Sequence, residues 1–276
     1  MIKVAAIYVY PVKSLAGIDV KKARVEPRGL QWDRRWMLVD GKGQFLSQRT
    51  LPILGGLQPE LTENHLVIHD LKNGKESLSI PLLSSTKESA EVVIWDDTVN
   101  AVTVSEEADK WFSDYLGQPC RLVFMDEAAK RKTDPRYALS TQDEVSFADG
   151  YPLMMLSESA MDLLNSKCPE PMQVARFRPN VFLSGCRPHE EDEWRDIQIG
   201  TVGFTGVKPC ARCVMTTIHP KTLVKSAEPL ATLTGYRKKG NKILFGENFI
   251  PRKSGMIQVG DEVIVNTRKA AFHNLQ

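Results

Sequence analysis

The sequence predicts a mainly β protein of the α+β class, with a few helices and two domains. Short β-rich runs separated by turn residues fill the first hundred residues, so we expect an N-terminal β-rich module over residues 1–100. A helical repeat of apolar residues follows, and β-rich runs then return toward the C-terminus. A second, mainly β domain is therefore expected over residues 101–276.

Four runs in the first hundred residues have the length and composition of strands. They are rich in β-branched and aromatic residues, and clusters of Gly, Pro, Asn and Asp separate them. The expected strands cover residues 4–10, 36–39, 66–69 and 92–95.

Two helices are expected after these strands. Between residues 105 and 116 the apolar side chains recur at helical spacing and share one face, and Gly117 is a suitable end for the helix. These apolar residues are Ala108, Trp111, Phe112, Tyr115 and Leu116. A second helix is expected to begin at Ser157, a favourable N-cap, and to reach about Asn165.

β structure is expected again in the second domain. The strands are expected at residues 181–184, 197–199, 203–207, 214–218 and 256–265. Residues 126–141, which contain four basic residues and Pro135, predict a mobile surface loop or linker.

The composition excludes several classes of protein. A chain of 276 residues with 42% hydrophobic and 25% charged residues is typical of a globular protein. No apolar run approaches the roughly 18 residues of a membrane-spanning helix. The formal net charge of +2 predicts no overall attraction to nucleic acid or to anionic lipid, so neither is expected as a partner. The sequence also lacks the glycine motifs of common nucleotide-binding loops.

The cysteines and the N-terminus indicate a cytoplasmic protein. The first residues have the pattern of a strand and not that of a signal peptide. The five cysteines are an odd number and only Cys210 and Cys213 stand close together, which favours a reducing compartment.

The sharpest chemical signal is the segment KPCARC at residues 208–213. A CxxC pair supplies half of a zinc site, a thiol–disulfide exchange centre, or one reactive thiolate with a neighbour. Zinc needs four ligands and no second CxxC exists, whereas exchange centres lie at a helix N-terminus and a strand is expected here. We therefore interpret Cys213 as a thiolate that Arg212 favours and that binds a soft or high-valent metal. Two buried, reduced cysteines at a strand entry are the alternative.

Two N-terminal segments offer cationic groups to a ligand. Lys13 and Ser14 follow a strand and suit an anion such as a phosphate, although a solvated lysine in a turn is the alternative. Arg34 is followed by a second arginine and then by Trp36, an arrangement that calls for a partner anion or carboxylate. A surface pair between Arg34 and Asp33 is the alternative there.

Two later segments offer polar groups as well. Arg176, Arg178 and Asn180 alternate ahead of an apolar strand, so they share one face and either hold a polyanionic or heterocyclic ligand or protect a sheet edge. Asp149 lies in a turn-rich segment before the second helix. Its carboxylate either accepts from ring N–H groups of a pterin-like ligand or closes an Asx turn.

Taken together, these segments closely resemble the MOSC-domain molybdoproteins. The resemblance is to the branch that contains the mitochondrial amidoxime-reducing components and the bacterial proteins that detoxify hydroxylaminopurine. Eight motifs occur in order between about residues 2 and 265. They are YPVKS at 10–14, DRRW at 33–36, QR at 48–49, FADGYP at 147–152, FRPN at 177–180, EDEW at 191–194, KPCARC at 208–213 and FGENF at 245–249.

The resemblance implies a molybdenum cofactor, in which a molybdopterin ene-dithiolate and one protein thiolate hold the metal. In the family the second cysteine of CxRC is the ligand, and here that residue is Cys213. Family members hold the phosphate and the pterin with residues that match Lys13, Ser14, Arg34, Asp149, Arg178, Asn180, Arg212 and Asn248. The resemblance also implies a C-terminal MOSC β-barrel, with the cofactor between the two domains.

The resemblance further implies an oxidoreductase that reduces N-hydroxylated compounds, such as hydroxylaminopurines, amidoximes and hydroxylamines. Many bacterial relatives append a plant-type ferredoxin domain, whose cysteine spacing this sequence lacks. An external electron donor is therefore expected, namely a flavin reductase, a ferredoxin or a cytochrome. The alternative is that the sequence is part of a longer protein with a ferredoxin domain. A cofactor or sulfur carrier without turnover is the main alternative, and a zinc-stabilised β protein that binds partners is a weaker one.

Overall fold

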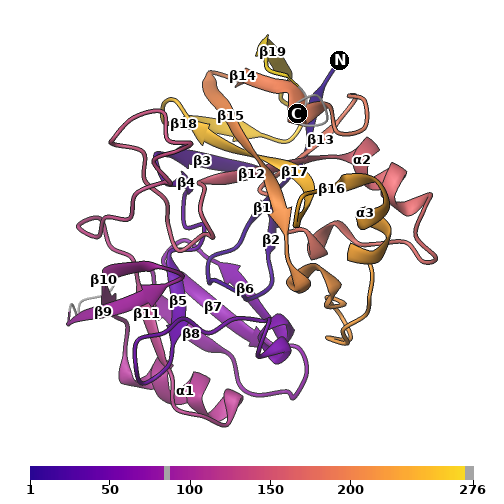
Figure 1. The fold of residues 1–276 in the computed structure, drawn as a ribbon. Coiled ribbons are helices and arrows are strands. Elements are labelled where there is room, and N and C mark those ends of the chain that lie inside the picture. The colour runs from indigo at the N-terminus through magenta and orange to yellow at the C-terminus, as the bar shows by residue number, and fades with distance from the viewer. Residues whose placement is uncertain (84–87, 271–276) are drawn as a thin grey trace.

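The computed structural model describes residues 1–83 and 88–270. Strands account for 41% and helices for 16% of the structure, which confirms the mainly β, α+β prediction. Figure 1 shows two parts, with the largest sheet in the upper half and the smaller N-terminal sheets with the first helix in the lower half.

The upper part contains a sheet of nine strands among the described residues. Its order is β19-β14-β15-β17-β12-β13-β1-β2, with β16 paired to β17. The strands are β1 (Lys3–Val9), β2 (Ile18–Val20), β12 (Leu153–Ser157), β13 (Val181–Ser184), β14 (Trp194–Ile199), β15 (Val202–Arg212), β16 (Lys238–Lys239), β17 (Lys242–Pro251) and β19 (Val263–Arg268). Because β1 pairs with β13, the start of the chain belongs to the sheet that the C-terminal residues build.

A small sheet strengthens this link between the two ends of the chain. It has the order β18-β3-β4 and is formed by β18 (Gly255–Gln258), β3 (Lys22–Glu26) and β4 (Gly29–Leu30). The first four strands of the chain therefore pair within the upper part, whereas Val12 and Leu15, in the connection between β1 and β2, are buried in the core of the lower part.

The lower part contains two further sheets. One has the order β5-β11-β10-β9, with β5 (Trp36–Val39), β11 (Arg121–Phe124), β10 (Asp97–Thr103) and β9 (Ser89–Ile94). The other consists of β6 (Leu57–Leu61), β7 (His65–Asp70) and β8 (Leu78–Pro81), after the short 3-10 helix η1 (Pro52–Gly56). The domain boundary expected near residue 100 falls inside β10, whose sheet continues into β11.

The two expected helices form, and Gly117 and Ser157 take their expected places at the helix ends. In α1 (Glu106–Leu116) the Ser105 hydroxyl accepts from the amide of Ala108, and Gly117 ends the helix at φ +65°. In α2 (Glu158–Asn165) Ser157 caps the first turn in the same way. A third helix, α3 (Leu230–Arg237), was not predicted, because it lacks a capping side chain and a clear apolar face.

Two expected strands differ in the structure. Residues 214–218 were expected to be extended, but Val214–Thr217 form the 3-10 helix η4. The hydroxyls of Thr216 and Thr217 donate to carbonyls three residues earlier, which favours a turn over β structure. The single strand expected over 256–265 is divided into β18 and β19 by a turn at Gly260, where φ is +93°.

The connection between β11 and β12 contains the expected linker at residues 126–141. Arg28 donates to the carbonyls of Asp126 and Ala129, and Arg131 donates to the carbonyls of Ser146 and Ala148. Arg28 thus binds main-chain oxygens within the segment, and Arg131, which belongs to the segment, binds main-chain oxygens beyond its end, so the linker is anchored to the fold.

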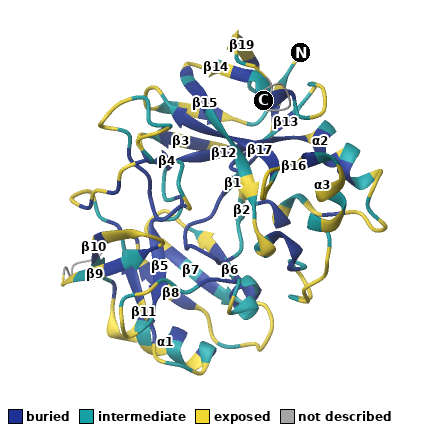
Figure 2. Ribbon diagram, in the orientation of Figure 1, coloured by how far each residue is buried: buried dark blue, intermediate teal, exposed yellow. Residues whose placement is uncertain are grey.

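Each part has its own hydrophobic core. Trp194, Phe204 and Phe249 are buried beneath the large sheet, and Trp36 and Phe112 are buried in the lower part. Figure 2 shows that buried residues follow the strands of both parts, whereas the outer face of α1 is exposed. In the part of the chain that the structure describes, no helix is long and apolar enough to cross a membrane.

Candidate functional site

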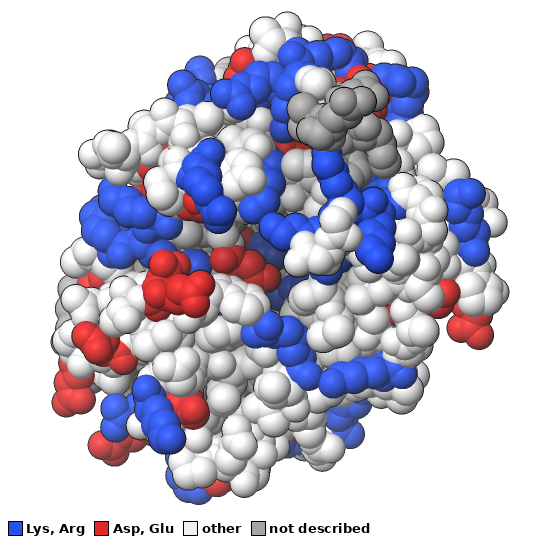
Figure 3. Space-filling model, in the orientation of Figure 1, with Lys and Arg blue, Asp and Glu red and all other residues white. Residues whose placement is uncertain are grey.

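A pocket of about 860 Å³ is lined by residues of both parts of the molecule. Figure 3 shows a hollow near the centre of the visible face, with Lys and Arg side chains around it. All nine residues predicted for the site line this one pocket. They are Lys13, Ser14, Arg34, Asp149, Arg178, Asn180, Arg212, Cys213 and Asn248.

Two guanidinium groups pack on one aromatic ring in this pocket. The Arg34 and Arg178 groups each lie 4.2 Å from the centroid of the Tyr10 ring. Arg34 also pairs with Asp33 at 2.5 Å, and Arg178 donates to the carbonyl of Leu15 at 2.6 Å. Burial, and then the charge of Arg34, lower the pKa of Arg178 to about 10. Two cationic groups this close together repel each other, so binding of an anionic ligand next to them is favoured.

The backbone around the pocket is held in an unfavourable conformation. Ser14, Arg34, Trp95 and Arg178 all have positive φ, between +51° and +70°, and all four line the pocket. Such angles in residues other than glycine cost about 1–3 kcal/mol each and concentrate at functional sites. The fold therefore places these side chains at a local energetic cost.

Lys13 and Asp149 form an ion pair at the pocket wall. The Lys13 ammonium lies 2.6 Å from Asp149 Oδ1 and donates to the carbonyl of Phe147 at 2.9 Å. Lys13 is buried, and burial lowers the pKa of its ammonium although Asp149 opposes this shift. The Asp149 side chain is 72% exposed within the pocket. Enclosure by the pocket raises the pKa of its carboxyl, but the charge and hydrogen bond of Lys13 outweigh this effect and hold it well below its usual range.

The two cysteines of the CxxC pair differ in solvent exposure. Cys213 is exposed, whereas Cys210 is half-buried and packs against the cluster that contains Phe177 and Phe245. Arg212 was expected to act on Cys213. Instead its Nη1 lies 2.8 Å from Cys210 Sγ, and its Nη2 donates to the carbonyl of Phe177. Arg212 lies beside Cys210 because β15 extends through Arg212, and residues i and i+2 of a strand share a face.

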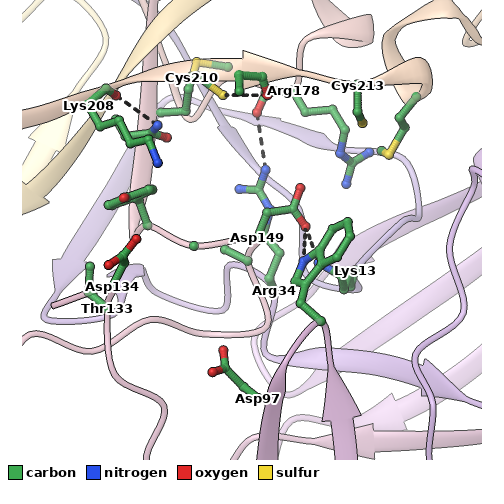
Figure 4. A pocket seen from close by; sticks show the side chains of 18 of the residues that line it. Lys13, Arg34, Asp97, Thr133, Asp134, Asp149, Arg178, Lys208, Cys210 and Cys213 are labelled. Atoms are coloured by element: carbon green, nitrogen blue, oxygen red, sulfur yellow. Dashed lines mark hydrogen bonds and ion pairs between the residues drawn. The ribbon is translucent and has the colours of Figure 1, made fainter. Parts of the chain in front are cut away.

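Figure 4 shows Cys210 and Cys213 along the upper wall of the pocket. Burial raises the pKa of the Cys210 thiol, and the Arg212 charge only partly opposes this. The protonated form of Cys210 is thus favoured, which suits a supporting role. A 3-10 turn and not a strand follows Cys213, so the expected strand no longer argues against an exchange centre.

The two predicted asparagines have different surroundings. Asn180 accepts from the amide of Met154 and donates to the carbonyl of Tyr8, so its side chain joins β12 to β1. Asn248 donates to the carbonyl of Lys208 across the β15–β17 pair. Asn180 consequently positions the neighbouring strands.

Several residues of the pocket were missed from the sequence. Phe45, Arg49 and Trp95 come from the lower part, and Thr133 and Asp134 come from the linker. Arg49 lies in the QR motif, and Trp95 was expected only as the end of a strand. The signal that identifies Trp95 is a bulky aromatic residue in a two-residue turn between β9 and β10.

The donor set of the pocket fits the molybdenum cofactor implied by the resemblance. Cationic side chains are available for a phosphate, carboxylate and amide groups for a heterocycle, and an exposed thiol for a metal. Arg212 Nε is buried in the pocket wall and lacks a hydrogen-bond partner among the described residues. Among those residues there is also no group of three His, Cys, Asp or Glu side chains that could hold a metal ion. A metal that arrives within an organic ligand needs only the single thiolate.

The fold and the pocket define a two-part β protein with a cationic cavity and one exposed thiol. The MOSC N-terminal beta barrel domain matches residues 1–119, and the MOSC domain matches residues 142–264. The chain therefore belongs to the MOSC-domain family.

Several characterised proteins are similar to this chain. Mitochondrial amidoxime reducing component 2 of Rattus norvegicus is 31% identical over 279 residues, which cover 94% of this chain and 82% of that protein. Mitochondrial amidoxime-reducing component 1 of Homo sapiens is 30% identical, with coverage of 94% and 82%. A molybdenum cofactor sulfurase of Oryza sativa is 34% identical over 89% of this chain. The chain spans only 32% of the length of that sulfurase.

Proposed function

We propose that this protein binds the molybdenum cofactor and reduces N-hydroxylated compounds, such as hydroxylaminopurines, amidoximes and hydroxylamines, by two electrons. The supporting observation is the convergence of nine sequence-predicted residues on one pocket, with the thiol of Cys213 exposed in it. The similarity to proteins named amidoxime-reducing components supports the reaction class.

The residues of the pocket have different roles in this proposal. Cys213 supplies the thiolate ligand of the metal. Lys13, Arg34 and Arg178 bind the phosphate, because they place cationic donors along one wall. Asp149 accepts from ring N–H groups of the heterocycle, since its carboxylate is ionised and exposed within the pocket. Ser14, Arg212 and Asn248 complete the polar wall, and Asn180 holds the strands in place.

When bound, the cofactor supplies the two-electron chemistry that cleaves the N–O bond. The chain orients the cofactor by one thiolate at one end and by cations at the other. The ion pair between Lys13 and Asp149 fixes the direction of both side chains before any ligand arrives, so little side-chain entropy is lost on binding. The cleavage also needs two protons, and the pocket is open to solvent that can deliver them.

The proposal includes an external electron donor, which is a flavin reductase, a ferredoxin or a cytochrome. Substrates are small N-hydroxylated molecules, since a pocket of about 860 Å³ must hold both cofactor and substrate. A cytoplasmic location remains a prediction from the cysteine content.

The test is turnover by the purified, molybdenum-containing protein with an artificial reductant. We expect consumption of a hydroxylamine or an amidoxime and formation of one equivalent of the amine or amidine. The Cys213→Ala variant serves as the control, and both preparations are analysed for molybdenum. Loss of substrate at the same rate in the wild type and in this variant would contradict the proposal.

A second candidate function is that of a cofactor or sulfur carrier. The similarity to the Oryza sativa sulfurase favours it, as does the exposure of Cys213, which is able to carry a persulfide. Such a carrier retains molybdenum but leaves a hydroxylamine unchanged in the same assay. Mass spectrometry of Cys213 distinguishes a persulfide from a free thiol.

A further inference from the structure

Trp95 occupies an unusual place in the wall of the pocket. β9 ends at Ile94 and β10 begins at Asp97, and these two residues pair across the hairpin. Trp95 is the first residue of this two-residue turn, and its φ is +56°. Turns of this kind favour glycine or asparagine at such positions, because a Cβ crowds the backbone there. A tryptophan at this position therefore destabilises the turn relative to glycine or asparagine.

The indole of Trp95 is held in one orientation. Its Nε1 donates to Asp149 Oδ1 at 3.3 Å, and the Arg49 guanidinium lies 4.2 Å from the ring centroid. The ring of Phe45 is 5.2 Å away, at an angle of 53°. Asp149 Oδ1 therefore binds both the Lys13 ammonium and the indole N–H, and Figure 4 shows the Asp149 carboxylate next to Lys13. The fold has thus fixed the ring before a ligand binds.

Despite these contacts, Trp95 remains 41% exposed, and it lines the pocket together with Phe45 and Arg49. Large apolar surface left open in a cavity is available for a ligand. A flat π-system is the ligand that gains most from an indole face. Asp149 lies at the edge of the indole, where its carboxylate can accept from an N–H group of the same ligand.

We propose that Trp95 is a stacking platform for a flat heteroaromatic ring that carries N–H donors, with Asp149 as the acceptor at the ring edge. Two sources of such a ring fit the pocket: the pterin of the cofactor, and a purine-like or aryl substrate. The inference deepens the proposed function and rests on it for the identity of the ring. The experiment below measures binding of the ring and not turnover. Its outcome can therefore contradict the stacking role of Trp95 without contradicting the proposed reductase activity, and the reverse.

The experiment measures the affinity of the cofactor-free protein for pterin and for adenine by equilibrium dialysis. Trp95→Phe retains an aromatic face, whereas Trp95→Leu and Trp95→Asn remove it. Asparagine tolerates positive φ, so the Asn variant keeps the turn and guards against loss of folding. Trp111→Leu is the matched control, since Trp111 lies on α1 and does not line the pocket.

Base stacking on an aromatic side chain contributes enough that its loss lowers affinity by about tenfold. We expect this loss for the Leu and Asn variants, a change of less than about threefold for Trp95→Phe, and no change for Trp111→Leu. The thermal midpoint of Trp95→Asn should equal or exceed that of the wild type, because the turn is relieved.

The two sources of the ring are separated by repeating the measurement with cofactor-loaded protein. If the pterin stacks on Trp95, loading abolishes binding of both free rings. If a substrate ring stacks there, adenine still binds the loaded protein and still depends on Trp95. The proposal is overturned if the wild type binds neither ring, or if the Phe and Leu variants bind equally well or lose affinity equally.

Discussion

Replacing Cys213 by alanine should remove the metal without weakening the fold. The thiol is exposed, and an exposed substitution away from caps and cores changes the free energy of unfolding by less than about 0.5 kcal/mol. For a chain of this size that corresponds to a shift in thermal midpoint of less than about 2 °C. Molybdenum content should fall from the wild-type stoichiometry to near zero. Among the described residues, Cys213 is the only exposed cysteine that lines the pocket, so no other thiol can replace it as the ligand.

Cys210→Ala is the matched control, because it removes the same atom three residues away. The Cys210 sulfur contacts Arg212 Nη1 at 2.8 Å and packs against the cluster around Phe177, so its loss should cost about 1–2 kcal/mol of stability. Most of the molybdenum should nevertheless be retained.

The assay is elemental analysis of freshly isolated protein, combined with thermal unfolding of the cofactor-free form. Unfolding is measured without cofactor because a bound ligand stabilises the folded state by itself. Wild-type molybdenum in Cys213→Ala, or loss of the metal only in Cys210→Ala, would refute the assignment of the ligand.

Three further predictions concern charge. Lys13→Ala and Arg34→Ala should weaken cofactor retention and make it less dependent on salt concentration, because each removes an attraction to the phosphate. Cofactor content measured from low to high salt tests this. If cofactor retention by the wild type does not depend on salt, these residues do not act through the phosphate charge. Burial, and then the charge of Asp192, raise the pKa of Glu191 from its ordinary 4.5 to about 7, so the folded state binds this proton more tightly and stability should fall as the pH rises between these values. Urea unfolding at several pH values tests it, and an identical pH profile in Glu191→Gln would show that another group is responsible. Arg237 is fully buried, and its guanidinium lies 2.6 Å from the Asp192 carboxylate. Replacing Arg237 by methionine should therefore lower the free energy of unfolding by about 3–5 kcal/mol, with or without bound molybdenum. A thermal midpoint within about 2 °C of the wild type would be inconsistent with a buried charge pair.

Local patterns were sufficient to predict the first two helices. The caps of α1 and α2 depend on residues within one turn, and the apolar spacing of α1 depends only on its own eleven residues. The same local reasoning failed for residues 214–218, because two threonine hydroxyls bind the backbone and outweigh the β propensity of the segment. α3 was missed because packing of Leu233 and Arg237, not a sequence pattern, holds it.

The candidate site was predicted residue by residue, but its geometry was not. The resemblance to a family, carried by eight motifs, indicated the nine residues, and those residues do line one pocket. The sequence placed Arg212 beside Cys213, whereas the strand alternation of β15 directs its guanidinium to Cys210. Trp95 carried no motif, and its importance becomes visible only from its backbone angle and its contact with Asp149.

By itself, the sequence determined the mainly β class, the end of α1 at Gly117 and the start of α2 at Ser157, because each of these depends on side chains close together in the chain. Only the tertiary structure decided that β1 and β3 pair with β13 and β18 from the C-terminal half, and that Lys13 meets Asp149 across 136 positions. Strand pairing and ion pairs between distant segments depend on which surfaces the whole chain buries, and no local pattern records that choice.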